Sequence, residues 1–173
     1  MENIVKSIKS YNQEVRDEFR EAMSELLRHQ NFKKLADFKQ HYKCTRLKHC
    51  VDVGYFSFYL AKLLGLDYLS AGKAALLHDL YFHKESKLKH RIKTLRNHPE
   101  EALENALEIC DLSEKECDII AKHMWLVTLK PPKSAEGFIV TFVDKYCAAK
   151  EFVSSVFSKK FAGKSGARMD RFI

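Results

Sequence analysis

The sequence predicts an all-α fold, a single-domain helical bundle, on three observations. Apolar residues recur at steps of three and four along most of the chain, which is the spacing of one helix face. Only six Gly and three Pro occur among 173 residues, so tight turns are few. No segment has the pattern of a strand. A chain of this length can bury one sizeable core, which favours a single domain.

The N-terminal segment, residues 1–40, predicts a long amphipathic helix followed by a short one near residues 32–38. We expect this segment to pack on the core formed by residues 41–158. Residues 159–173 are expected to form a basic, flexible tail. The apolar stripe of the long helix consists of Ile4, Ile8, Tyr11, Val15, Phe19, Met23 and Leu26.

Two central helices follow from their start and stop signals. Thr45 is a suitable N-cap for a helix that runs to about residue 64, and Gly65 is a suitable stop. A second helix is predicted over residues 67–82. The stretch 83–97 is polar and basic, and we interpret it as the longest loop of the chain.

Three C-terminal helices complete the bundle. Pro99 is favoured as the first residue of a helix, and acidic residues follow it in the first turn. The sequence SEKE at 113–116 is a capping box that opens the next helix, which ends before Pro131. The last helix is predicted over residues 135–156.

The net charge of +7 is concentrated in two segments. Residues 84–96 carry six basic and one acidic side chain, and residues 159–171 carry five basic and one acidic side chain. Such segments are compatible with an anionic ligand, but they are equally compatible with solvated surface. Binding of nucleic acid by the tail is disfavoured, because only Phe161 and Phe172 could stack on bases.

Cysteine usage and the chain start favour a cytoplasmic protein. The five cysteines are odd in number and form no Cys-x-x-Cys, so we interpret them as reduced thiols. The opening MENIVKSIKS is charged and does not resemble a secretory signal. No apolar run is long enough to span a bilayer, so no membrane association is expected.

Histidines and aspartates interrupt the apolar faces of the predicted helices. In AALLHDLYFHK (74–84), His78 and Asp79 follow a run that is apolar on every side. An isolated inward histidine is usually bonded to a backbone carbonyl, and each histidine here can be interpreted in that way. The other polar residues on inward positions are His49, His98, His123 and Asp144.

The aspartates indicate a metal. An ionised carboxylate that is buried without a partner destabilises the fold by roughly several kcal/mol, unless its pKa shifts until the group is neutral. The sequence offers no inward-facing Arg or Lys for Asp79 and Asp144, so the cation should come from outside the chain. Imidazole with carboxylate suits one or two divalent transition metal ions, with iron, manganese, zinc, nickel and cobalt as candidates. Adjacent helical residues such as His78 and Asp79 can both reach an ion placed between them.

These residues resemble a known family. His49, the pair His78–Asp79, and Asp144 match in order the H…HD…D pattern of the HD-domain superfamily of metal-dependent phosphohydrolases. The flanks RLKHCVDVGYFSFYLAKLLGLD, AALLHDL and VTFVDKYCAAKEF agree with it. The resemblance covers roughly residues 41–153 and implies a helical HD domain in which these four residues bind one metal.

Two further histidines resemble a subset of the family that binds a second metal. In that subset, which includes HD-GYP phosphodiesterases and bacterial diadenosine tetraphosphate hydrolases, two additional histidines hold an ion that the aspartate of the doublet bridges. His98 and His123 match these positions, but the GYP signature is absent, which disfavours the former enzymes. The alternative is a single-metal site in which the two histidines only pack in the core or touch substrate.

The resemblance implies a phosphohydrolase that acts on a nucleotide or other phosphate ester or anhydride by attack of a metal-activated water. Asp79 would be the catalytic, bridging residue. Arg46, His83 and Lys145 are candidates for contacts with the substrate phosphates, and the expected partner is a phosphorylated small molecule. The alternative is a regulatory module that binds metal and nucleotide without turnover. The oligomeric state is left open.

Overall fold

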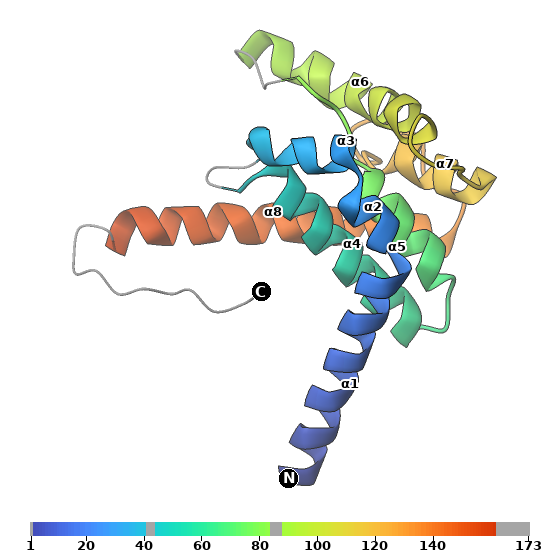
Figure 1. Ribbon diagram of the computed structural model, residues 1–173. Helices are drawn as coiled ribbons and strands as arrows, with labels where there is room; N and C mark the ends of the chain where they lie inside the picture. Colours follow the sequence, from blue (N-terminus) through green and yellow to red (C-terminus); the bar gives the residue numbers. More distant parts are fainter. Residues whose placement is uncertain (1, 41–43, 84–87, 162–173) are drawn as a thin grey trace.

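The protein forms a helical bundle, as the sequence predicts (Figure 1). Over the described residues it has eight α-helices, one 3₁₀ helix and no strand; Lys39 and Thr45 form an isolated bridge. The structure is a computed structural model that describes residues 2–40, 44–83 and 88–161, without the side chains of residues 2–8, 88–96 and 158–161.

Helix α5 lies at the centre of the bundle, in contact with α4, α6, α7 and α8. In chain order the elements are α1 (Glu2–Ala22), α2 (Ser24–Arg28), α3 (Gln30–Lys33), the 3₁₀ helix η1 (Lys34–Asp37), α4 (Arg46–Leu63), α5 (Tyr68–Leu77), α6 (Leu88–Leu107), α7 (Glu114–Lys122) and α8 (Ala135–Phe161).

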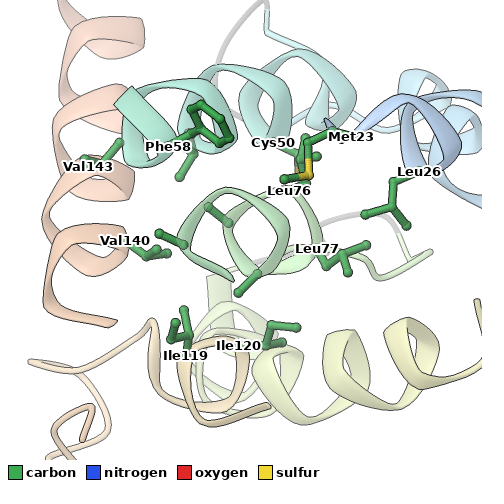
Figure 2. Packing of buried hydrophobic residues seen from close by; sticks show 14 of the residues in the cluster. Met23, Leu26, Cys50, Phe58, Leu76, Leu77, Ile119, Ile120, Val140 and Val143 are labelled. Carbon is green, nitrogen blue, oxygen red and sulfur yellow. The ribbon is translucent and has the colours of Figure 1, made fainter. Parts of the chain in front are cut away.

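The central helix is buried on all sides from Ala74 to Leu77, which explains why this part of its sequence shows no polar face. Figure 2 shows side chains of α4, α7 and α8 converging on Leu76 and Leu77 of α5. Two glycines let α4 and α5 approach closely. A Cβ at Gly54 would lie 2.8 Å from the Leu76 side chain, and one at Gly72 would lie 2.9 Å from Phe58. Larger residues at these positions would therefore separate the two helices.

The N-terminal helix packs on the bundle through its C-terminal half, while its N-terminal end extends away from the body (Figure 1). Val15, Phe19 and Met23 of the predicted stripe are buried. The Phe19 ring packs edge-on against Phe58 and Tyr55, with ring centroids 5.4 and 5.7 Å apart. The predicted long helix is divided at Met23 into α1 and α2.

Local signals place both ends of α4 and the start of α7 as predicted, whereas α7 ends at Lys122, well before Pro131. The Thr45 hydroxyl accepts from the backbone N–H of Lys48 at 3.2 Å, and Gly65 follows α4 with a φ of 68°. Ser113 and Glu116 form the complete capping box at the start of α7. Caps of this kind satisfy backbone groups that the first and last turns leave free.

Two predicted boundaries around the His78–Asp79 pair are wrong. Helix α5 ends at Leu77, not near residue 82, so the pair lies in the turn that follows the helix. The stretch 83–97 is not a loop throughout, because α6 begins at Leu88. Residues 84–87 of the predicted loop lie outside the described residues. Leu88, Ile92 and Leu95 have helical spacing, a signal that the many charges obscured.

Two other helix ends also differ from the prediction. Pro99 does not begin a helix but lies inside α6, so His98 is an interior helical residue. A proline ring lacks the N–H for one helical hydrogen bond, which is why it was expected at a helix start. Helix α8 continues past residue 156 to Phe161, and the rest of the predicted tail lies outside the described residues. Among the helices described here, none has the length and apolar composition of a membrane span.

Candidate metal centre

Five elements bring the predicted polar residues to one place beside the C-terminal end of α5. His49 comes from α4, and His78 and Asp79 come from the turn after α5. Helix α6 supplies His98, the end of α7 supplies His123, and α8 supplies Asp144. All six side chains are buried. Because the ligands come from helices far apart in the sequence, the bundle itself determines their geometry.

One side of the cluster joins α4 to α8, and we call it the paired half. Nε2 of His49 lies 3.0 Å from Oδ1 of Asp144, and Nε2 of His78 lies 3.7 Å from the same oxygen. The outer nitrogen of His49, Nδ1, lies 2.9 Å from Oε1 of Glu151. Oδ2 of Asp144 accepts from the ammonium of Lys145 at 2.7 Å. The paired half thus consists of His49 and Asp144, supported by Glu151 and Lys145.

The other side consists of Asp79, His98 and His123, and we call it the histidine half. Oδ1 of Asp79 lies 3.1 Å from Nε2 of His98 and 3.7 Å from Nε2 of His123. The two histidine nitrogens lie 2.9 Å apart. Oδ2 of Asp79 lies 3.6 Å from Nε2 of His78. Asp79 therefore turns one oxygen toward the histidine half and the other toward His78, which lies between the two halves.

Backbone carbonyls fix the orientation of two imidazoles. Nδ1 of His78 donates to the carbonyl of Ala75 at 2.7 Å, and Nδ1 of His123 donates to the carbonyl of Ile120 at 2.8 Å. Both histidines are C-caps, so the carbonyls three residues earlier belong to last turns that have no helical donor. Since Nδ1 carries the proton, Nε2 of each ring presents a lone pair to the cluster.

Two buried atoms of the cluster have no hydrogen-bond partner among the described residues: Nε2 of His78 and Oδ1 of Asp79. Buried polar atoms in native proteins almost always have a partner, so these two indicate a ligand. Nitrogen or oxygen ligands bound at about 2.1 Å to one ion lie roughly 3.0 to 3.4 Å apart. The separations of 2.9 to 3.7 Å around Asp79 and Asp144 bracket this range. The residues therefore fit a metal.

The spacing of the ligand atoms defines two overlapping groups. His49, His78 and Asp144 each offer an atom within 4.8 Å of the others, and so do His78, Asp79 and His123. His78 belongs to both groups. The arrangement can accommodate one ion near His78 or two ions on either side of it.

Electrostatics keep both carboxylates ionised. Burial opposes ionisation of Asp79, but electrostatic attraction to the neighbouring imidazoles of His78 and His98 outweighs it and holds the pKa of Asp79 well below its usual range. Burial is likewise outweighed at Asp144, where the hydrogen bond with His49 and the charge of Lys145 lower the pKa. Both side chains are thus anionic ligands at neutral pH.

The two halves affect their histidines in opposite directions. Burial and the neighbouring imidazoles of His78 and His98 lower the pKa of His123 to about 3, so its ring is neutral. Burial would also lower the pKa of His49, but hydrogen bonds with Asp144 and Glu151 raise it to about 10. Without a metal, His49 is held as a cation between two carboxylates, and Nε2 releases a proton when it becomes a ligand.

The prediction that no Arg or Lys faces inward is wrong. Arg46 is fully buried, with its guanidinium over the Tyr81 ring at 3.4 Å and donating to the Tyr81 carbonyl at 2.5 Å. It also donates to Oε1 of Gln40 at 2.8 Å, and the amide of Gln40 donates to Oδ2 of Asp79. Lys145 bonds Asp144 directly. The metal argument therefore rests on the partnerless atoms and the fixed imidazoles, not on missing cations.

The three candidate substrate contacts lie at different depths. Arg46 is buried, with Nη2 lacking a hydrogen-bond partner among the described residues. Lys145 is partly exposed and reaches the carbonyl of His123 as well as Asp144. His83 is exposed, 3.2 Å from Glu101, and its ring lies 4.8 Å from that of Tyr81. Contact of these three residues with substrate stays a prediction.

Sequence reasoning missed two residues that touch the ligands. Glu151 holds His49, and its position seven residues after Asp144 places it on the same face of α8, so its spacing was a usable signal. Gln40 reaches Asp79 from the segment after η1. No helical periodicity marks that segment, so the sequence contains no comparable signal for Gln40.

A comparison with protein families identifies the fold. The family model described as HD domain matches residues 46–149, more than half of the chain. The chain belongs to the HD domain family. All six clustered residues lie within the matched range of this HD domain, whereas Gln40 and Glu151 lie outside it. No curated protein and no solved structure matches the chain.

Membership in the HD family agrees with the cluster. Proteins of this family are in general metal-dependent phosphohydrolases, and the HD domain here contains His/Asp groups that could hold metal. The ordered residues that led to the resemblance therefore lie both in the matched region and around one site.

Proposed function

We propose that this HD-domain protein hydrolyses a phosphorylated small molecule, a nucleotide or another phosphate ester or anhydride. The observation that carries the proposal is the pair of partnerless buried atoms, Nε2 of His78 and Oδ1 of Asp79, within a cluster of two ionised carboxylates and four imidazoles. A purely structural polar core would pair these atoms, because each unsatisfied group costs roughly 1 to 3 kcal/mol.

Two divalent transition ions suit the cluster better than one. The two oxygens of Asp79 face different neighbours, Oδ1 toward His98 and His123 and Oδ2 toward His78. This is the orientation expected of a bridging carboxylate. When bound, divalent ions held by these residues would lower the pKa of a bound water and neutralise charge that develops on a phosphoryl group. Iron, manganese, zinc, nickel and cobalt all suit these ligands.

The surrounding residues keep the ligands in position. The carbonyls of Ala75 and Ile120 hold His78 and His123 in the tautomer with a free Nε2. Glu151 orients His49, and Lys145 orients Asp144. Because these contacts exist before any substrate arrives, they reduce the reorganisation that the reaction requires.

We further propose that substrate phosphates bind near Lys145 and His83, whose side chains are partly exposed. Lys145 has three donors, and a phosphate oxygen could replace its bond to the His123 carbonyl. Arg46 is the most deeply buried of the three candidates. Its present bonds to Gln40 and Tyr81 support a second role, that of holding the amide of Gln40 against Asp79.

The test combines metal analysis of the purified protein with a hydrolysis screen of mono-, di- and polyphosphate nucleotides. We expect bound transition metal and release of phosphate or nucleotide that a chelator abolishes. In Asp79→Asn, metal content and turnover should both be lost, whereas the exposed control Asp111→Asn should retain both. Full metal content in Asp79→Asn would contradict the bridging role.

The alternative function is a regulatory module. A metal-loaded wild-type protein that binds a nucleotide tightly but yields no product would support this alternative and contradict the hydrolase. Hydrolysis that a chelator leaves unchanged would contradict both.

A further inference from the structure

The outer face of α8 carries an apolar stripe that the other described helices cover only in part. Its side chains lie at steps of four, seven, three and one residues, which keeps them on one side of the helix. Each is about half exposed: Phe142 57%, Tyr146 60%, Val153 50%, Val156 43% and Phe157 56%. The C-terminal part of α8 also extends beyond α4 (Figure 1). Exposed apolar stripes of this kind mark interaction sites.

We propose that this stripe is the interface of a two-fold symmetric dimer, in which α8 packs antiparallel against α8 of a second copy of this chain. The sequence of the stripe is self-complementary about the point between Ala149 and Lys150. In an antiparallel pair centred there, Tyr146 lies opposite Val153 of the second copy, and Phe142 lies opposite Phe157. A two-fold interface requires this reciprocity, since the same surface must serve both copies.

The centre of the stripe permits close approach of the two helices. Ala149 is small and exposed, so backbones can come near each other at the symmetry axis. The neighbouring Lys150 does not block this contact, because its ammonium lies over the Phe56 ring of α4, 5.4 Å from the ring centroid. Its charge is thus held over a ring of α4.

A hollow at one end of the stripe can accommodate an aromatic side chain of the second copy. It has a volume of about 330 Å³ and lies between α4 and α8. Its lining is almost entirely apolar and consists of Phe56, Tyr59, Leu60, Phe142, Val143 and Tyr146. In the antiparallel arrangement, Phe157 of the second copy lies opposite Phe142, at the mouth of this hollow. Aromatic anchors that fill apolar pockets contribute much of the affinity of interfaces.

The area of the stripe is sufficient for a stable dimer. With about 200 Å² for each aromatic side chain and somewhat less for valine, the five residues expose roughly 500 Å² of apolar surface. A standard interface buries about 800 Å² per partner, of which a little more than half is apolar. The stripe therefore supplies the apolar part of such an interface by itself.

Sedimentation of the full-length protein over a range of concentrations tests the dimer. We expect a species of twice the 20.1 kDa chain mass at micromolar concentration. Because of the two-fold symmetry, Tyr146→Lys and Val153→Glu each introduce two charges into the interface, one from each copy. Each variant should raise the dissociation constant of the dimer by on the order of 100-fold. The control Leu107→Glu, at a similarly exposed position on α6, should not change it.

The double variant Tyr146→Lys/Val153→Glu tests the orientation. In the antiparallel pair each lysine meets a glutamate of the second copy, so dimerisation should recover relative to either single variant. Circular dichroism confirms that the variants remain folded. A wild-type monomer at all concentrations, a dimer unaffected by both single variants, or no recovery in the double variant overturns the proposal.

Discussion

The two halves of the buried cluster are held by different means. In the paired half, each ligand has a protein partner of opposite charge, Glu151 for His49 and Lys145 for Asp144. In the histidine half, Asp79 faces imidazoles, and its Oδ1 has no hydrogen-bond partner among the described residues. The ligand charges of the paired half are thus matched by protein charges without a metal, although Oε2 of Glu151 also lacks a hydrogen-bond partner among the described residues, whereas the charge of Asp79 is not matched in this way. We infer that the histidine half depends more strongly on bound metal for its structure.

The helices that carry the two halves also differ in their length and packing. Helices α4 and α8, which hold His49 and Asp144, are long and pack against each other and the central α5. Helix α7, which ends at His123, has nine residues. Short helices derive little stability from their own hydrogen bonds and depend on tertiary contacts. Helix α6, which holds His98, is long but packs mainly against α7, so loss of a metal should be felt first at these two helices.

The largest expected difference between the two halves is in the number of metal ions that remain bound when a histidine is removed. His98→Ala and His123→Ala should each bind one ion in place of two, because the paired half and His78 still offer three ligands. Elemental analysis per chain measures this count. One ion in the wild type under metal-replete conditions, unchanged in both variants, would reject the two-metal site and leave a mononuclear one.

Metal removal should destabilise the protein unevenly. A ligand present at 100 times its dissociation constant contributes about 2.7 kcal/mol, which for a chain of this size corresponds to a shift in Tm of roughly 5 to 10 °C. After chelation, hydrogen exchange should accelerate more in α6 and α7 than in α4 and α8. Equal acceleration in all four helices would show that the two halves respond as one unit.

The polar residues of the site were predictable because their chemistry conflicts with their surroundings. His49, His123 and Asp144 stand on apolar helix faces, where spacing alone shows that they point inward. The environment of Asp79 was not predictable in the same way. Gln40 and the Tyr81 carbonyl reach the site from segments without regular structure, and their positions depend on the whole bundle. Arg46 is different, because it lies on α4 three residues before His49, and this spacing already placed it on a similar face although it was not counted as an inward cation.

Helix ends near the site were also predictable only where a local sequence signal marks them. The caps at Thr45 and Ser113 are local and were correct. The predictions for the end of α5, at Leu77, and for the start of α6, at Leu88, were wrong. No Gly or Pro marks the end of α5, and the charges of residues 84–96 obscure the start of α6. Interactions with the rest of the bundle determine these ends.

A smaller effect is expected from Glu151, which supports the paired half from outside the ligand set. Glu151→Ala removes the partner of Nδ1 of His49 and should weaken metal binding 10- to 100-fold, as is usual for residues that orient a ligand. Glu151→Gln retains an acceptor and should restore part of that affinity. Titration with the metal while both variants remain folded measures the change. Equal affinity in Glu151→Ala and wild type would show that His49 needs no such support.

The smallest expected effect compares the two N-caps. Ser113→Ala and Thr45→Ala each remove one hydroxyl that accepts from a backbone N–H, and each should lower the free energy of unfolding by about 1 kcal/mol. Their consequences for metal should differ. Ser113 caps the short α7, which ends ten residues later at His123, whereas Thr45 precedes the long α4. We expect Ser113→Ala to lower occupancy of the second ion and Thr45→Ala to leave it unchanged. Denaturant titration establishes that the losses of stability are equal, and metal content at limiting metal then gives the comparison. The same occupancy in both variants would mean that α7 is held by its packing alone, and the proposed weakness of the histidine half would be wrong.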